Sequence, residues 1–306
     1  MKRFCPRVLS YIFMKEYRVY MEYLLLSIVL VCAAVNVVAQ KQYAIKNTHP
    51  ASPVLFNIET ALVMLIAFLV LNRGRYVFHL PTVGYAVAFS VGFILFAEFG
   101  VKAVGSGPLG ITNLLLQYSL ILPTAAGVLF WNEKITFGRV AGIVLFLFSL
   151  GLLNLRANNG EKPPTWRWGI CVTLAFLGNG ICAITQKMQQ RAFPQQYRCE
   201  FMMTAMVFAM LLGIFHLIPM KKDNITAGFR QGIGWVFLYA IGNSAINFLV
   251  MMLCVRMSAS IMFPTIAAGG ILLNLLIAFI IYREKFSRTQ VAAFFFGMIS
   301  LILLNW

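Results

Sequence analysis

The chain has 306 residues, of which 60% are hydrophobic and only 11% are charged, and its mean hydropathy is +0.82. A soluble domain has about 45–50% apolar residues, so this composition excludes a soluble globular protein and predicts an integral membrane protein. The net charge of +16 comes from basic residues scattered among short connections. Because they form no single basic stripe, we expect no nucleic-acid partner.

Residues 1–22 are predicted to form a basic arm before the first membrane span. An apolar stretch at 8–14 is too short to cross a bilayer, and it is flanked by Lys2, Arg3, Arg7, Lys15 and Arg18. No small-residue cleavage site follows it before Lys15, so we expect an uncleaved amphipathic arm on the membrane surface.

Ten apolar runs follow along the chain, separated by short polar segments. A hydrocarbon core about 30 Å thick requires about 20 apolar residues per helix. Runs near that length are found at 23–44, 53–72, 81–101, 107–131, 137–155, 168–187, 199–219, 232–254, 259–282 and 288–306. They predict an all-α integral membrane fold with ten transmembrane helices.

Basic residues give a weak indication of orientation. With the N-terminus inside, about 13 Lys and Arg fall in inside segments and about 12 fall outside, which is no bias. The basic arm alone therefore favours both termini in the cytoplasm of a multi-pass protein of the cell (inner or plasma) membrane.

Two turns repeat at an offset of 151 residues, Glu133 matching Glu284. The first reads Trp-Asn-Glu-Lys-Ile-Thr at 131–136 and the second Tyr-Arg-Glu-Lys-Phe-Ser at 282–287, each before an apolar run. The match predicts a duplication, with one five-helix repeat at 23–157 and another at 165–306. Because five is an odd number, the second repeat should enter the membrane inverted relative to the first.

Two five-helix repeats, each closing with an apolar helix, a Glu-Lys-[Ile/Phe]-[Thr/Ser] turn and a final helix, resemble the EamA-like family of the drug/metabolite transporter (DMT) superfamily. The resemblance covers nearly the whole chain, although its motifs are loose. It implies a secondary active transporter, most simply an exporter of a small polar metabolite such as an amino acid. Such a carrier works by alternating access around a midplane site between the repeats.

The repeated turn itself is better explained by structure than by substrate contact. Thr136 and Ser287 are placed to cap the helices that follow, and a Glu beside a Lys at a membrane surface is usually solvated or paired. The half-length small multidrug resistance pumps, which are distant relatives, carry a membrane-embedded Glu in the first helix. The span at 23–44 has no carboxylate, which argues against a cationic-drug mechanism.

Glu59 and Glu98 are carboxylates inside predicted spans, where an ionisable residue is a functional candidate by default. Burial disfavours the charged form of a carboxyl group, so either could couple transport to protons. The alternatives are that Lys102, one turn on, neutralises Glu98, and that Glu59 lies near the membrane surface.

Lys41 and Lys187 end the first helix of each repeat in a matching Gln-Lys pair, after Gln40 and Gln186. Such lysines usually extend to the headgroups, but they could instead attract an anionic group of a substrate. Arg256 ends the eighth helix as Lys102 ends the third, and the same alternatives apply to both.

Neutral polar side chains inside the spans are the candidate substrate contacts. Hydrogen bonds between helices explain such residues at least as often. Pro123 and Pro264 could break helices beside them. The candidates are Asn36, Gln40, Gln117, Tyr118, Asn179, Gln186, Asn243, Asn247 and Asn274.

Other functional classes fit the sequence less well. Six cysteines lack CxxC spacing and three histidines lack metal spacing, so we expect no disulfide, metal or cofactor. A lipid-modifying enzyme would need such a centre, and we do not expect an enzyme; a channel is the other rival. Drug efflux and sugar or nucleoside uptake remain alternatives for the carrier. The expected partners are a small molecule and the bilayer, with protons as the candidate coupling ion, for a monomer or weak homodimer.

Overall fold

The computed structural model describes residues 6–47, 49–106, 109–133, 136–154, 165–220, 232–280 and 288–304. These residues form helices and connections, with no strand among them. The helices are α1 (Pro6–Lys46), α2 (Ser52–Leu71), α3 (Leu80–Ser106), α4 (Leu109–Tyr118), α5 (Ile121–Trp131), α6 (Phe137–Asn154), α7 (Trp166–Ala192), α8 (Arg198–Leu217), α10 (Ile233–Arg256), α11 (Ala259–Ile280) and α12 (Arg288–Leu304).

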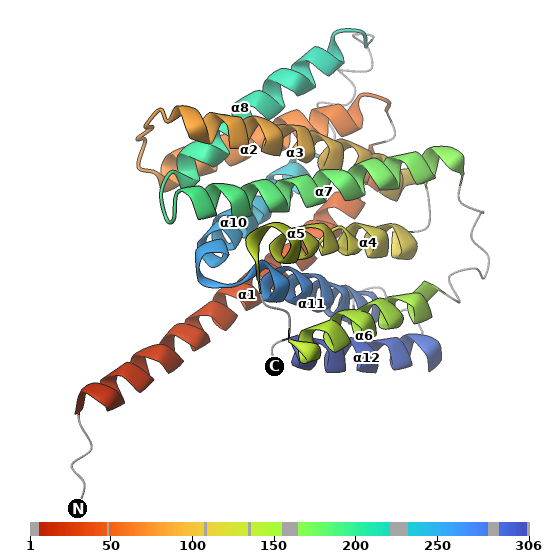
Figure 1. Ribbon diagram of the computed structural model, residues 1–306. Coiled ribbons are helices and arrows are strands. Elements are labelled where there is room, and N and C mark those ends of the chain that lie inside the picture. Colours follow the sequence, from red (N-terminus) through yellow and green to blue (C-terminus); the bar gives the residue numbers. More distant parts are fainter. Residues whose placement is uncertain are drawn as a thin grey trace, which may run out of the picture.

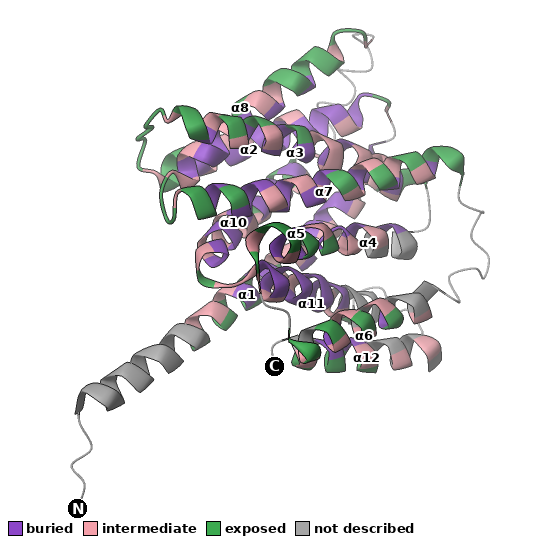
Figure 2. Cartoon of the chain, in the orientation of Figure 1, coloured by how far each residue is buried: buried purple, intermediate pink, exposed green. Residues whose placement is uncertain are grey.

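The distribution of side chains is that of an all-α, multi-pass membrane protein. Within the described ranges, six helices are long and apolar enough to cross a bilayer: the 20–46 part of α1, then α2, α3, α7, α8 and α10. Exposed residues lie mainly on outward helix faces and buried ones between helices (Figure 2). Large apolar side chains such as Ile66, Val70 and Leu211 are exposed, whereas amide side chains such as Asn57 and Gln186 are buried.

The chain departs from the expected single span at 107–131, because two shorter helices, α4 and α5, occupy it. A turn at Ser119 and Leu120 separates them, and Pro123 explains its position. Proline has no N–H for the carbonyl four residues earlier, which here belongs to Ser119, and its ring clashes with that carbonyl. α1 also differs from the expected boundary, since it begins at Pro6 and continues through the basic arm without a break.

Helices distant in sequence pack side by side (Figure 1). The most extensive contacts are between α3 and α7, α6 and α12, α1 and α10, and α2 and α8. Glycines bring α3 and α7 close, because a Cβ added at Gly92 would lie 2.8 Å from the carbonyl oxygen of Gly178. Without a hydrophobic driving force between helices in lipid, small residues at a crossing permit the close packing that holds them together.

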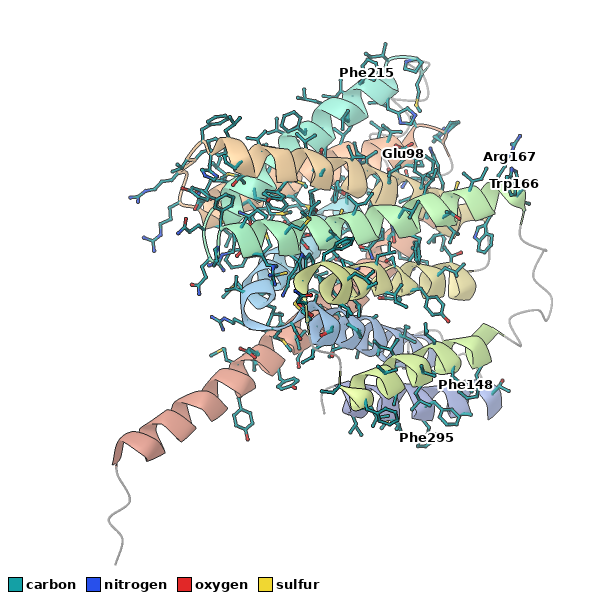
Figure 3. All side chains as sticks on the ribbon, in the orientation of Figure 1. Glu98, Phe148, Trp166, Arg167, Phe215 and Phe295 are labelled. Carbon is teal, nitrogen blue, oxygen red and sulfur yellow. The ribbon has the colours of Figure 1, made fainter. Side chains whose placement is uncertain are left out.

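α6 and α12 form an outer pair on one side of the bundle (Figure 1). The rings of Phe148 and Phe296 meet edge to face, with centroids 5.3 Å apart. Phe148 and Phe295 lie at the outer edge of this pair (Figure 3), and both are exposed. α11 connects the pair to the rest of the bundle, so the polar interior lies away from α6 and α12.

Candidate functional site

Asn36 of α1 lies against α10 at Gly242, where a Cβ would collide with its side chain. With its amide oriented to satisfy both neighbours, Asn36 donates to the carbonyl of Tyr239 and accepts from the N–H of Asn243, each at 3.2 Å. The absence of a side chain at Gly242 therefore allows a buried amide from one helix to bond the backbone of another.

A chain of amides continues from this point across α10 to α7. The Asn247 amide nitrogen donates to the carbonyl of Asn243 at 2.7 Å. Gln186 of α7 donates to the Asn247 side-chain oxygen, also at 2.7 Å. Asn243 in turn lies 3.5 Å from the sulfur of Met64 on α2. Four of the predicted polar residues, Asn36, Gln186, Asn243 and Asn247, thus form one buried network, which we call the amide network.

Three more buried polar residues lie on α1 and α2 beside this network. Gln40, Asn57 and Thr60 are 6%, 0% and 0% exposed. The Gln40 amide nitrogen, both amide atoms of Asn57 and the Thr60 hydroxyl have no hydrogen-bond partner. An unpaired buried polar group costs about 1–3 kcal/mol, so this region carries a hydrogen-bonding capacity that the fold itself does not use.

Tyr43 links the end of α1 to the beginning of α2. The ring of Tyr43 packs on Phe56 with centroids 4.7 Å apart, and its hydroxyl donates to the carbonyl of Ser52 at 2.9 Å. The Gln40 amide nitrogen faces α3, where a Cβ at Gly100 would lie 3.5 Å from it. Asn57 and Thr60 were not predicted as site residues. The available signal was their position beside Glu59, in Asn-Ile-Glu-Thr at 57–60.

Glu59 is also buried, at 9% exposure, and its Oε1 has no hydrogen-bond partner. Glu59 is thus enclosed by protein, and whether it lies deep in the membrane or near its surface stays a prediction. It is a buried carboxylate without a compensating contact on that oxygen.

Glu98 is held in an ion-pair cluster. One carboxylate oxygen lies 2.6 Å from the Lys102 ammonium, and the other lies 3.1 Å from Nδ1 of His216 on α8. The predicted pairing with Lys102 is confirmed, whereas the part played by His216 was not predicted. Figure 3 shows Glu98 among the helices, while Phe215, next to His216, lies near the end of α8.

Lys187 does not extend to the membrane surface, so that expectation is wrong. It is 3% exposed, and its ammonium donates to the carbonyls of Cys254 and Met257 at 2.8 and 2.7 Å. Glu133 lies 4.0 Å away. Lys41 is half-buried and Arg256 is exposed.

The remaining candidates surround α5 and α11. Asn179 donates to the Ser119 hydroxyl at 2.7 Å, and Gln117 lies against Gly270 of α11. Tyr118 packs beside the apolar cluster between α1, α10 and α11. Asn274 is in α11, but its side chain lies outside the described residues, as do Lys134 and the whole turn at 282–287.

A second repeated motif was missed in the sequence. Ser-x-x-x-Pro-Thr occurs at 119–124 and again at 260–265. Each proline follows by four residues a serine near the start of a helix, α5 or α11. The two threonines make the same bond, Thr124 to the carbonyl of Leu120 at 2.8 Å and Thr265 to that of Ile261 at 2.7 Å.

No group of three or more His, Cys, Asp or Glu side chains that could hold a metal ion is found in the described part of the chain. The unpaired buried polar groups described above are amides, a hydroxyl and the Glu59 carboxylate, whose Oε1 has no partner.

Comparison with known proteins identifies a shared fold and no family. No family model and no curated protein matches the chain. Among 28 matching chains of solved structures is one described as "Crystal structure of protein", with a TM-score of 0.66 and 14% identity over 93% of this chain and 96% of the other. At this identity the likeness concerns the fold alone.

Proposed function

We propose that this protein is a secondary active transporter of a small polar metabolite, built from two inverted five-helix repeats that alternate around the amide network. Its membrane is the cell (inner or plasma) membrane, and both termini are cytoplasmic. α1 to α6 form the first repeat, with α4 and α5 together acting as one broken span. α7 to α12 form the second.

One observation carries this proposal, a pair of matching contacts between the halves. Gly242 of α10 faces Asn36 of α1, whose amide bonds the carbonyl of Tyr239. Gly92 of α3 faces Cys182 of α7, where a Cβ would lie 3.1 Å from the sulfur, and that thiol bonds the carbonyl of Phe89 at 3.6 Å.

The residue numbers relate the two contacts. Gly92 to Gly242 and Phe89 to Tyr239 are each 150 positions apart, and Asn36 to Cys182 is 146, as is Gln40 to Gln186. An exchange of the two halves would therefore convert one contact into the other. The helix contacts follow the same exchange. Exchanging the halves converts the pair α3–α7 into α10–α1. It converts the pairs α2–α8 and α6–α12 into themselves.

Transport is the function that such an arrangement supports best. Two inverted copies have two nearly equivalent packings, and exchange between them opens a central site first to one side and then to the other. The amide network joins α1 of one half to α7 and α10 of the other. Its uncharged donors and acceptors suit a small polar substrate more than a hydrophobic one.

Counterflow in proteoliposomes tests the proposal. Purified protein would be preloaded with unlabelled amino acids, sugars, nucleosides or quaternary amines, and uptake of the same labelled solute would be followed. We expect saturable, trans-stimulated uptake of a solute from one class. Flux that rises linearly with concentration would instead indicate a channel, and no flux for any class would contradict the proposal.

A matched pair of variants on α7 links the flux to the site. Gln186→Met is nearly isosteric but removes the amide that binds Asn247, and we expect it to reduce counterflow about tenfold or more. Met188→Leu, at an exposed position two residues on, should leave counterflow unchanged.

A further inference from the structure

Glu133 binds the beginning of α11 from the end of α5. Its two carboxylate oxygens accept hydrogen bonds from the backbone N–H groups of Ala259 and Ser260, each at 2.9 Å. These are among the N–H groups at a helix start that have no partner within the helix. A carboxylate there also meets the positive end of the helix dipole.

Lys187 makes the complementary contact at the end of α10. Its ammonium binds the carbonyls of Cys254 and Met257, where the helix dipole is negative. The Glu133 and Lys187 side chains are only 10% and 4% exposed. Both charges are therefore buried, and both are stabilised by the ends of α10 and α11.

Residues at the end of α5 place the Glu133 side chain at the beginning of α11. Asn132 has φ +52°, the left-handed conformation in which Asn is the commonest residue after Gly. The chain reverses there, and the N–H of Glu133 bonds back to the carbonyl of Gly127 at 3.2 Å. A Cβ at Gly127 would lie 2.9 Å from a Glu133 carboxylate oxygen, so the glycine provides the space that the carboxylate occupies.

Helices α7 and α10 connect the cluster of Glu133 and Lys187 to the amide network. Lys187 follows Gln186 in α7, and Cys254 lies two turns after Asn247 in α10. The cluster also joins the two halves of the chain, because Glu133 comes from the first half and α10, α11 and Lys187 from the second. It lies where α5 and α10 end and α11 begins.

We infer that the bond between Glu133 and the start of α11 is a gate that closes the substrate pathway on this side of the protein. The inference rests on the proposed transport function. When the gate opens, α5 separates from α11, and water replaces the partners of Glu133 and Lys187. A charged contact of this kind is stable when fully made or fully hydrated, and unfavourable when half broken and still buried. It therefore has two discrete states, as alternating access requires.

Accessibility of Cys254 tests the gate without any substrate. This thiol is 3% exposed, and its own carbonyl binds Lys187. With the other five cysteines replaced by alanine, the rate of alkylation by a small water-soluble maleimide would be measured in proteoliposomes. We expect Glu133→Gln to raise this rate about tenfold, as for the loss of one charge-assisted hydrogen bond. Gly127→Ala should raise it too, by displacing the carboxylate.

Two control variants separate the gate from general loosening. Asn132→Gly keeps the left-handed turn and should leave the rate unchanged, and so should Glu98→Gln, which breaks an ion pair between α3 and α8. Equal rates in the parent, Glu133→Gln and Gly127→Ala would overturn the inference, as would an equal increase in Glu98→Gln. If counterflow were absent but the Cys254 alkylation rates changed as expected, the transport proposal would be contradicted. The inference that the Glu133 contact opens and closes would still hold.

Discussion

At the scale of single residues, their partners separate three buried carboxylates into two kinds. Glu98 and Glu133 have partners for both oxygens, whereas Oε1 of Glu59 has none. The oxygens of Glu98 and Glu133 are already engaged in contacts that hold helices together. Glu59 is therefore the stronger candidate for coupling.

We expect Glu59→Gln to abolish the dependence of net transport on a proton gradient while keeping counterflow, because exchange of substrate needs no net proton movement. Uptake with and without an imposed pH gradient, measured in the same proteoliposomes, checks this. Glu98→Gln serves as the comparison and should retain the dependence on the gradient. Retention of that dependence in Glu59→Gln would exclude Glu59 as the coupling group.

We expect the Asn57 side chain to lower the stability of the fold and to contribute to transport. Both atoms of its amide are buried and unpaired, so Asn57→Leu should raise the free energy of unfolding by about 1 kcal/mol and reduce counterflow. Asn247→Leu should instead lower stability by about 1–3 kcal/mol, because it leaves the Gln186 amide unpaired. Thermal unfolding in detergent gives both comparisons, and a destabilised Asn57→Leu would mean that the amide has a partner that supports the fold.

At the scale of helices, close crossings depend on glycine and broken spans depend on proline. α3 and α7 approach through Gly92 and Gly178, and Pro123 separates α4 from α5. From the sequence, both Pro123 and Pro264 were expected to break helices, but Pro264 lies within the continuous helix α11. The close approach at Gly92 and Gly178 was not predicted. The span at 107–131 was predicted as one helix because its hydropathy is continuous across the proline.

Gly178→Ala tests the crossing of α3 and α7. Its Cβ would lie 2.5 Å from the carbonyl oxygen of Gly92 and from the N–H nitrogen of Phe96, both backbone atoms that cannot rotate away. We expect a loss of about 1–3 kcal/mol in the free energy of unfolding. Gly169→Ala, in the same helix with no atom within 4 Å, should be neutral or slightly stabilising. Equal unfolding temperatures for the two variants would contradict this account.

At the scale of the whole molecule, connections distant in sequence lie together on one side of the bundle. His79 stacks on Tyr197 with ring centroids 4.2 Å apart, and Tyr76 bonds Thr204 at 2.8 Å. The connection after α2 and the one after α7 are therefore neighbours. The inverted-repeat proposal places both in the cytoplasm and the connection after α1 on the other side.

Single cysteines in an otherwise cysteine-free chain test this topology. Arg75→Cys and Gln196→Cys should react with an impermeant thiol reagent only when the cytoplasmic side is exposed, and His49→Cys only from the opposite side. Labelling of Arg75→Cys and Gln196→Cys from different sides would rule out the arrangement. Labelling of all three with the sides reversed would keep the repeats and reverse the orientation.

The sequence by itself determined the class of protein and most of its helices, because hydropathy and run length depend on local composition. The sequence also contains the repeated turn, and it identified the candidate polar side chains, four of which form the amide network. Only the tertiary structure decided which of these residues pair. Lys187 and Glu133 are 54 positions apart, and Gln186 and Asn247 are 61 apart, so their contacts depend on how helices cross. No local pattern distinguishes a lysine that extends to the lipid headgroups from one that binds the end of a distant helix.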